Sequence, residues 1–140
     1  MSIRNPLFPS LLRNAGLKAT AQRLHLLEVL SKEKRPLSVT LLKEKLPSVD
    51  QVTIYRSLEA MCAHDLVRKV GMQGVATHYE LLATRKHHHH VLCSSCGKIE
   101  DVDACLPKDL ENRVLRSAKN FSEITTHSLE FIGRCKQCTQ

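Results

Sequence analysis

Two pairs of cysteines carry the most specific chemistry in this sequence. Two residues separate the members of each pair, Cys93 with Cys96 and Cys135 with Cys138. A pair at this spacing presents two thiolates from one turn, and two such turns complete the tetrahedral all-thiolate set that binds zinc. Protein ligands then fill every position around the ion, so the role of the metal is structural. The sequence predicts a structural Zn2+ site at these four residues.

Two disulfides are the alternative use of the same residues. The sequence has six cysteines, and Cys62 and Cys105 lie outside the two pairs. No secretion signal is recognised, and leftover thiols suit a reducing compartment, where disulfides are rare. We therefore expect zinc and a cytoplasmic location. Cys62 falls on the apolar side of an expected helix and is interpreted as a core residue.

Four consecutive histidines, residues 87–90, offer a second kind of metal chemistry. In a strand, alternate side chains share a face, so His88 and His90 point to one side and His87 and His89 to the other. A mixed set of imidazoles and carboxylates suits Fe2+, Mn2+ or Zn2+. An expression tag is the trivial alternative, but this run is internal and continues into an apolar segment. A histidine site that can bind and release a metal, beside a four-cysteine site whose coordination is complete, indicates a metal sensor.

Charge divides the chain into two parts. Formal net charge is +7, yet residues 1–86 contain 14 Lys and Arg against 7 Asp and Glu, whereas residues 87–140 contain 7 of each. A basic half joined to a neutral half is typical of a nucleic-acid-binding domain attached to a second domain. A solvated basic surface is the plainer alternative. No segment approaches the ~18 apolar residues of a membrane span, so no membrane partner is expected.

The first half predicts helices followed by a hairpin. Apolar residues at helical spacing, with Leu41 among the inward positions, mark helices over 8–15, 20–30, 38–46 and 50–63. Thr20, Ser38 and either Ser48 or Asp50 are the expected N-caps. Strands over 66–70 and 78–82 follow, with Gly71 and Gly74 bracketing the turn. This order predicts a winged helix-turn-helix, whose recognition helix enters the DNA major groove.

The second half predicts a small α+β unit. Strands are expected over 87–92, 98–105 and 124–132, with a helix that begins at Pro107. Residues 87–140 are too few to form more than a thin core. We therefore expect zinc and a partner subunit to support this unit.

Several segments together resemble the ferric uptake regulator family over almost the whole chain. They are GLKATAQR at 16–23, VTIYRSL at 52–58, HYEL at 78–81, HHHHVLC-x2-CGK at 87–98 and HSLE-x2-G-x-C-x2-C at 127–138. The resemblance implies a homodimeric, metal-responsive transcription regulator, usually a repressor, that binds operator DNA. It implies an α+β chain with a winged-helix domain at 1–82, a hinge at 83–86 and a small α/β metal-binding dimerisation domain at 87–140.

The resemblance also implies two further sets of metal ligands. The regulatory set near the hinge is matched by Glu80, His88, His90 and Asp101. A second set is matched by His87, His89, Glu111 and His127. Relatives often supply a histidine before the third helix, but residues 34–38 contain none, and His78 is the expected replacement. If Cys105 shares a strand face with Asp101, it adds a soft ligand that favours zinc; a small buried side chain is the alternative.

The polar face of the fourth helix is the expected DNA-reading surface. Tyr55 and Arg56 are the main candidates for base or backbone contacts, with Gln51 and Thr53 beside them. Phosphate contacts are expected from Lys18, Arg23, Arg68 and Lys69.

Two other functions compete with regulation. A zinc hydrolase lacks support because neither H-E-x-x-H nor a nucleophile motif occurs in the sequence. A metal-buffering module without DNA binding does not account for the charge asymmetry. We therefore expect a regulator and not an enzyme. Control by zinc, control by iron or manganese, and peroxide sensing all stay open.

Overall fold

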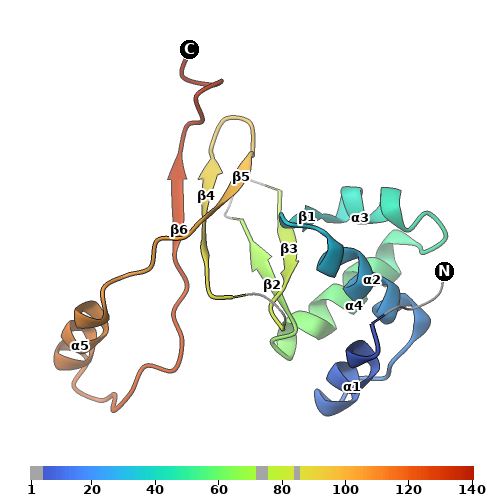
Figure 1. Ribbon diagram of the computed structural model, residues 1–140, viewed down its shortest axis with the longest axis horizontal. Helices are drawn as coiled ribbons and strands as arrows, with labels where there is room; N and C mark the ends of the chain where they lie inside the picture. Colours follow the sequence, from blue (N-terminus) through green and yellow to red (C-terminus); the bar gives the residue numbers. More distant parts are fainter. Residues whose placement is uncertain (1–4, 72–75, 84–85) are drawn as a thin grey trace. The chain divides into compact units, whose positions relative to one another are not determined.

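Helices and strands form two units in this computed structural model, which describes residues 5–71, 76–83 and 86–140. The units are Met1–Lys86 and His87–Gln140. Each has a three-stranded sheet of its own (Figure 1). The predicted hinge at 83–86 includes residues 84 and 85, which lie outside the described residues.

Three of the four helices of the first unit follow predicted capping residues, whereas α1 begins after Pro6 without a side-chain cap. The four helices are α1 Leu7–Asn14, α2 Ala21–Lys32, α3 Val39–Lys45 and α4 Gln51–Ala63. Thr20 Oγ1 accepts the backbone N–H of Arg23 at 3.4 Å, and Asp50 Oδ1 accepts that of Thr53 at 3.0 Å. Asp50 is thus the N-cap of α4, and its side chain satisfies one of the amides that a helix start leaves without an intrahelical partner.

A three-stranded antiparallel sheet completes this unit. Its strands are β1 Leu37–Ser38, β2 Val67–Val70 and β3 His78–Leu81, in the order β1-β3-β2. The β2–β3 hairpin is the predicted wing; its connection at 72–75, which includes Gly74, lies outside the described residues. The sequence does not predict β1, because two residues carry no periodicity and only the pairing with β3 makes them a strand.

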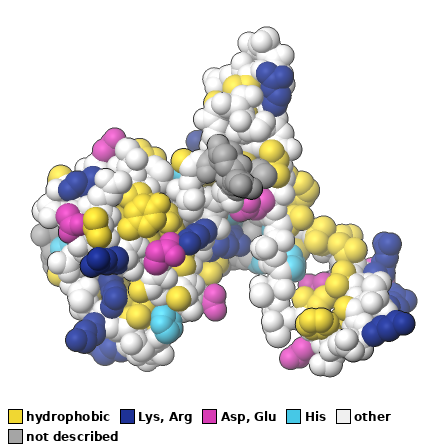
Figure 2. All heavy atoms as spheres, turned by 180° about the vertical axis from the view of Figure 1, so that it is seen from behind, with side chains coloured by type: hydrophobic (Ala, Val, Ile, Leu, Met, Phe, Trp, Pro, Cys, Tyr) yellow, Lys and Arg dark blue, Asp and Glu magenta, His cyan; other side chains and the backbone are white. Residues whose placement is uncertain are grey.

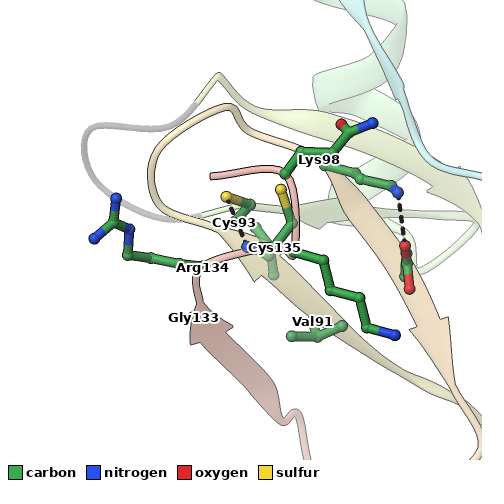
Figure 3. A pocket seen from close by; sticks show the side chains of 10 residues that line it. Val91, Cys93, Lys98, Gly133, Arg134 and Cys135 are labelled. Carbon is green, nitrogen blue, oxygen red and sulfur yellow. Dashed lines mark hydrogen bonds and ion pairs between the residues drawn. The ribbon is translucent and has the colours of Figure 1, made fainter. Parts of the chain in front are cut away.

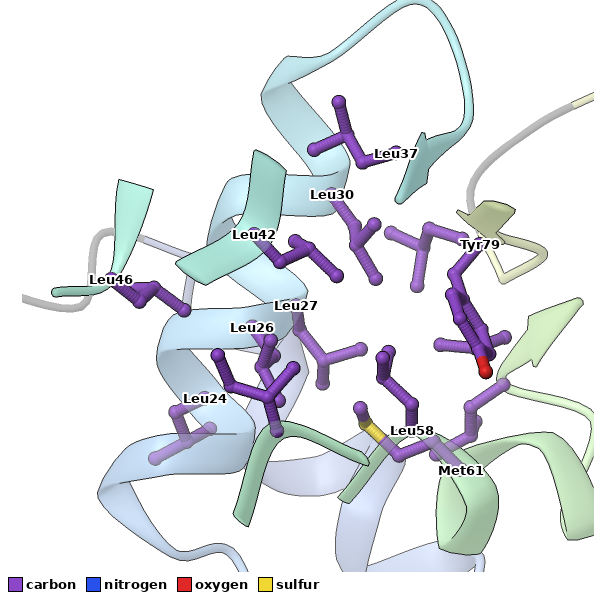
Figure 4. Packing of buried hydrophobic residues seen from close by; sticks show 14 of the residues in the cluster. Leu24, Leu26, Leu27, Leu30, Leu37, Leu42, Leu46, Leu58, Met61 and Tyr79 are labelled. Atoms are coloured by element: carbon purple, nitrogen blue, oxygen red, sulfur yellow. The ribbon is translucent and has the colours of Figure 1, made fainter. Parts of the chain in front are cut away.

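Leucines from α2, α3 and α4 pack against the sheet in the core of the first unit (Figure 4). Leu26, Leu42 and Leu58 are fully buried, and Tyr79 brings β3 into the same cluster. Leu41, predicted to face inward, is 40% exposed. The expectation is wrong because α3 has only seven residues and turns Val39 and Leu42, three positions apart, toward the core.

The second unit is built around a central strand. β4 His89–Cys93 pairs antiparallel with β5 Ile99–Val102 and parallel with β6 Glu130–Gly133, and α5 Lys108–Ser117 lies between β5 and β6 in the chain. All three strands are shorter than predicted, because β5 and β6 extend only where β4 offers a partner. As a result Cys105 lies beyond β5 and His127 lies before β6, both in connecting segments.

Helix α5 contributes no buried residue. Figure 1 shows it at the end of two long connections to the sheet, and Figure 2 shows hydrophobic side chains uncovered beside basic ones in this part of the molecule. Val114 is 47% exposed and Phe121 71%. The predicted apolar side of this helix therefore packs against little of the described chain. The only fully apolar side chains buried in the second unit, among the described residues, are Leu92 and Ile99.

Membrane insertion has no basis among the described helices, none of which combines the length and hydropathy of a bilayer-crossing segment.

Candidate metal centres and nucleic-acid interface

Parallel pairing of β4 with β6 brings the two cysteine turns together. Cys93 ends β4 opposite Gly133, and Cys135 follows two residues later. The four Sγ atoms lie within 4.8 Å of one another, with Cys96 and Cys135 3.6 Å apart. A tetrahedral Zn–S4 site with bonds of about 2.3 Å has S–S separations of about 3.8 Å, so the four thiols fit a zinc ion. None of the six cysteines forms a disulfide in this structure.

The four thiols differ in acidity. Cys93 Sγ accepts the backbone N–H of Cys135 at 3.3 Å (Figure 3). This hydrogen bond and one from the backbone N–H of Cys96 together lower the pKa of Cys93 to about 6. A backbone hydrogen bond from Cys138 likewise lowers the pKa of Cys135. The pKa of Cys138 rises to about 12, chiefly through its contact with the Cys135 sulfur. For Cys96, a backbone hydrogen bond from Lys98 lowers the pKa, but the neighbouring thiols outweigh it and the net shift is upward. Four adjacent thiols cannot all ionise without a cation among them.

Basic side chains border this cluster. A hollow between the ends of β4 and β6 is lined in part by Lys98, Arg134 and Lys136 (Figure 3). Lys98 Nζ lies 3.0 Å from Glu100 Oε1.

Three ligands of the predicted regulatory set gather within the second unit. His90 pairs with Asp101 across β4 and β5, and its Nε2 lies 3.4 Å from Asp101 Oδ1. The rings of His88 and His90 meet edge to face with centroids 4.8 Å apart. His90 is 2% exposed, so its position is set by packing. The alternation predicted for the histidine run thus holds on this face.

Glu80, the remaining member of that set, belongs to the first unit. The β2–β3 register places it opposite Arg68, whose Nε donates to Glu80 Oε1 at 2.8 Å and whose Nη2 contacts the same oxygen. The Glu80 side chain is 1% exposed and that of Arg68 23%. A buried carboxylate needs a cation beside it. Arg68, expected to contact phosphate, is engaged by Glu80.

His78 lies at the start of β3. Its Nδ1 is 2.6 Å from the carbonyl oxygen of Ala76, so this nitrogen donates and Nε2 is the one left to bind a metal. Whether His78 replaces the missing upstream histidine stays a prediction.

A third cluster contains the remaining two histidines of the run, together with His127 and a cysteine. The ligand atoms that converge within 4.8 Å are those of His87, His89, Cys105 and His127. Glu111, expected among the ligands, instead lies beside His127, with 3.2 Å between Glu111 Oε1 and His127 Nδ1. The expectation that Cys105 shares a strand face with Asp101 is wrong, since β5 ends at Val102 and the chain turns away.

The exposed face of α4 is the candidate nucleic-acid interface. Gln51 and Arg56 are exposed, and Tyr55 is 45% exposed. The Thr53 hydroxyl donates to Asp50, which anchors this side chain at the helix start.

Basic residues predicted to meet phosphate take part in local contacts. Arg23 Nη1 donates to the carbonyl oxygen of Lys18 at 3.0 Å, and Lys69 Nζ lies 2.8 Å from Glu59 Oε1.

A hollow beside the start of α4 is lined in part by Gln22 and His25 from α2. These two residues were not predicted, although their spacing of three places them on one side of the helix.

The helix-turn-helix with a wing and the metal-ligand clusters define a metal-binding, winged-helix regulator. The chain belongs to the ferric uptake regulator family, whose model matches residues 14–132. The predicted resemblance and the predicted α+β class are confirmed.

Relatives match along most of the chain. The ferric uptake regulation protein of Bacillus subtilis (strain 168) is 31% identical over 134 residues, which cover 91% of this chain and 89% of the relative. The Vibrio cholerae ferric uptake regulator has a TM-score of 0.69 at 30% identity, covering 91% and 98% of the two chains. The Pseudomonas aeruginosa regulator, solved with manganese, has a TM-score of 0.72 at 26% identity, covering 93% and 98%.

Proposed function

We propose that this protein is a homodimeric, cytoplasmic transcription regulator, acting as a repressor, whose DNA affinity is switched by a divalent metal. The regulatory ligands are Glu80, His88, His90 and Asp101. The observation that carries the proposal is the distribution of these ligands along the chain. Glu80 lies one residue before the end of β3 in the first unit, and His88 is the first ligand of the second, with only residues 81–87 between them.

One pair of the regulatory ligands has the separation expected around a divalent ion. Ligand atoms at about 2.0–2.2 Å from a tetrahedral ion lie about 3.3–3.6 Å apart. His90 Nε2 and Asp101 Oδ1, 3.4 Å apart, fall in this range. Imidazole with carboxylate accepts Zn2+, Fe2+ or Mn2+. The four-cysteine site is proposed to hold Zn2+ permanently, because its ligand set is closed.

Metal at ligands from both units would restrict the angle between them. A dimer presents two α4 helices, and these must match half-sites about 34–36 Å apart on the duplex. An ion that binds the matching arrangement more tightly shifts the population toward it. Tyr55 and Arg56 then face base edges, while Lys18, Arg23 and Lys69 lie nearest to phosphates.

Dimerisation is assigned to the second unit. Its exposed apolar side chains include Val114, Phe121, Phe131 and Ile132, which are between 44% and 71% exposed. Such a group of uncovered apolar residues on a unit with a thin core favours association with a second copy.

The test starts from a duplex selected out of a random library by wild-type protein in excess metal. Binding of that duplex is then measured against Zn2+, Mn2+ and Fe2+ concentration for wild type, His90→Ala and the control His64→Ala. His64 lies at the end of α4, outside every cluster described above. We expect His90→Ala to lose the metal dependence while keeping its thiolate-bound zinc and its dimeric mass.

A normal metal response of His90→Ala would remove the switch from this cluster. Failure to select any duplex would instead favour a metal-buffering module.

A further inference from the structure

We propose that Cys105 is a metal ligand in a site with one thiolate and three imidazoles, and that the bound zinc ion fastens the α5 segment to the central strand. The other ligands are His87, His89 and His127. The family resemblance implied a carboxylate, Glu111, in this set, whereas the geometry assigns the position to a thiol. The site lies wholly in the second unit and does not depend on the proposed switch.

Distances within the cluster match a tetrahedral zinc site. His87 Nε2 lies 3.0 Å from His89 Nε2 and 3.1 Å from His127 Nε2, and Cys105 Sγ lies 3.6 Å from His127 Nε2. Zinc bonds of about 2.05 Å to nitrogen and 2.3 Å to sulfur place N–N pairs about 3.3 Å apart and N–S pairs about 3.6 Å apart. The ligand atoms therefore surround a space of the size of one ion.

Hydrogen bonding alone does not explain this arrangement. An imidazole nitrogen either donates one hydrogen or accepts one, so His87 Nε2 can form a hydrogen bond with only one of the two nitrogens that face it. Protonating the rings would place positive charges about 3 Å apart, which is unfavourable. A cation between the rings gives every one of these nitrogens a favourable partner.

Glu111 has the position of an orienting group. Its Oε1 lies 3.2 Å from Nδ1 of His127, the ring nitrogen that does not face the cluster. A carboxylate in this place keeps the hydrogen on Nδ1 and leaves Nε2 free to bind a metal. Glu111 thus supports His127, and the fourth ligand is the Cys105 thiolate. A thiolate with imidazoles selects Zn2+ or Co2+ over Mn2+.

Two of the four ligands come from connecting segments on either side of α5, which bury little by themselves. His89 lies in β4 and is 1% exposed, whereas Cys105 lies between β5 and α5, and His127 lies between α5 and β6. Helix α5 buries no residue. An ion bound to these ligands joins both ends of the α5 segment to the sheet, and Glu111 joins the helix itself. The metal supplies the attachment that a hydrophobic core does not.

Cobalt provides a direct readout, because a thiolate ligand produces a near-ultraviolet charge-transfer band that nitrogen and oxygen ligands do not. Protein holding one zinc per chain in the four-cysteine site is titrated with Co2+ in a His90→Ala background, and native mass spectrometry checks that this zinc stays bound. We expect the band in this protein and in the control Cys62→Ser, but not in Cys105→Ala. Glu111→Gln should keep the band and weaken cobalt binding about tenfold or more.

A band that persists in Cys105→Ala would overturn the assignment, as would loss of the band in Glu111→Gln at saturating Co2+. Amide hydrogen exchange tests the fastening. Zn2+ should slow exchange over residues 103–127 in the parent protein and not in Cys105→Ala. Unchanged exchange in the zinc-bound parent would refute the fastening. Because neither readout involves DNA, the result is separate from the proposed regulation.

Discussion

Zinc binding to the four-cysteine site should release at least two protons at pH 7. Zinc binds thiolates, so every thiol still protonated must lose its hydrogen. The pKa values of Cys96 and Cys138 are raised above the ordinary value of 9.0, and both residues are thiols at pH 7. Cys93, with its pKa lowered to about 6, is already a thiolate and adds no proton. Cys96 and Cys138 therefore contribute one proton each.

The linkage sets the magnitude and sign of the pH dependence. Each released proton changes the apparent zinc affinity about tenfold per pH unit, so two protons make zinc binding about a hundredfold weaker for each unit that the pH falls from 8 to 7. Below about pH 6 the Cys93 thiolate is protonated as well, and the dependence steepens toward a thousandfold per unit.

Chelator competition measures this dependence. Zinc is partitioned between the protein and a chelator of known affinity from pH 6 to 8, in a variant with His90→Ala and Cys105→Ala to weaken the other clusters. Calorimetry in two buffers of different ionisation enthalpy counts the protons directly. A change of tenfold or less per pH unit, or a binding enthalpy that does not depend on the buffer, would show that the four thiols are not arranged as described.

Three further predictions concern the first unit. Arg56→Ala should weaken specific DNA binding by about 1–3 kcal/mol if Arg56 contacts a base, measured by fluorescence anisotropy against the control Arg116→Ala on α5; equal affinities would remove Arg56 from the interface. Arg68→Met leaves the buried Glu80 carboxylate without its guanidinium and should lower the free energy of unfolding, measured in urea, by about 3 kcal/mol. Most of this loss should be recovered when Glu80→Gln is added to Arg68→Met. An unchanged midpoint of urea unfolding would contradict the buried pair. His78→Ala should shift the metal response of DNA binding to higher concentration, whereas an unshifted response would leave the regulatory site to its other ligands.

Local signals in the sequence were sufficient for much of the first unit. Thr20, Ser38 and Asp50 begin helices where they were expected to, because a cap is a contact between residues three positions apart and is visible in sequence. The four-cysteine cluster was also predictable, since a pair with two residues between its members forms one turn whatever the surroundings. Charge asymmetry predicted a nucleic-acid-binding role for the first half for a similar reason, as composition needs no coordinates.

Only the tertiary structure decided the membership of the remaining clusters. Cys105 and His127 are far apart in sequence, and each was expected within a longer strand. The pairing of β4 ends both strands early and leaves the two residues in connections that meet beside His87 and His89. The role of Arg68 likewise depends on the register of β2 against β3, which places it opposite Glu80. Spacing in a sequence specifies which residues are neighbours within one turn or strand. Which ligands and counter-ions from separate segments come together depends instead on strand register and strand length. Both follow from pairing across the whole sheet.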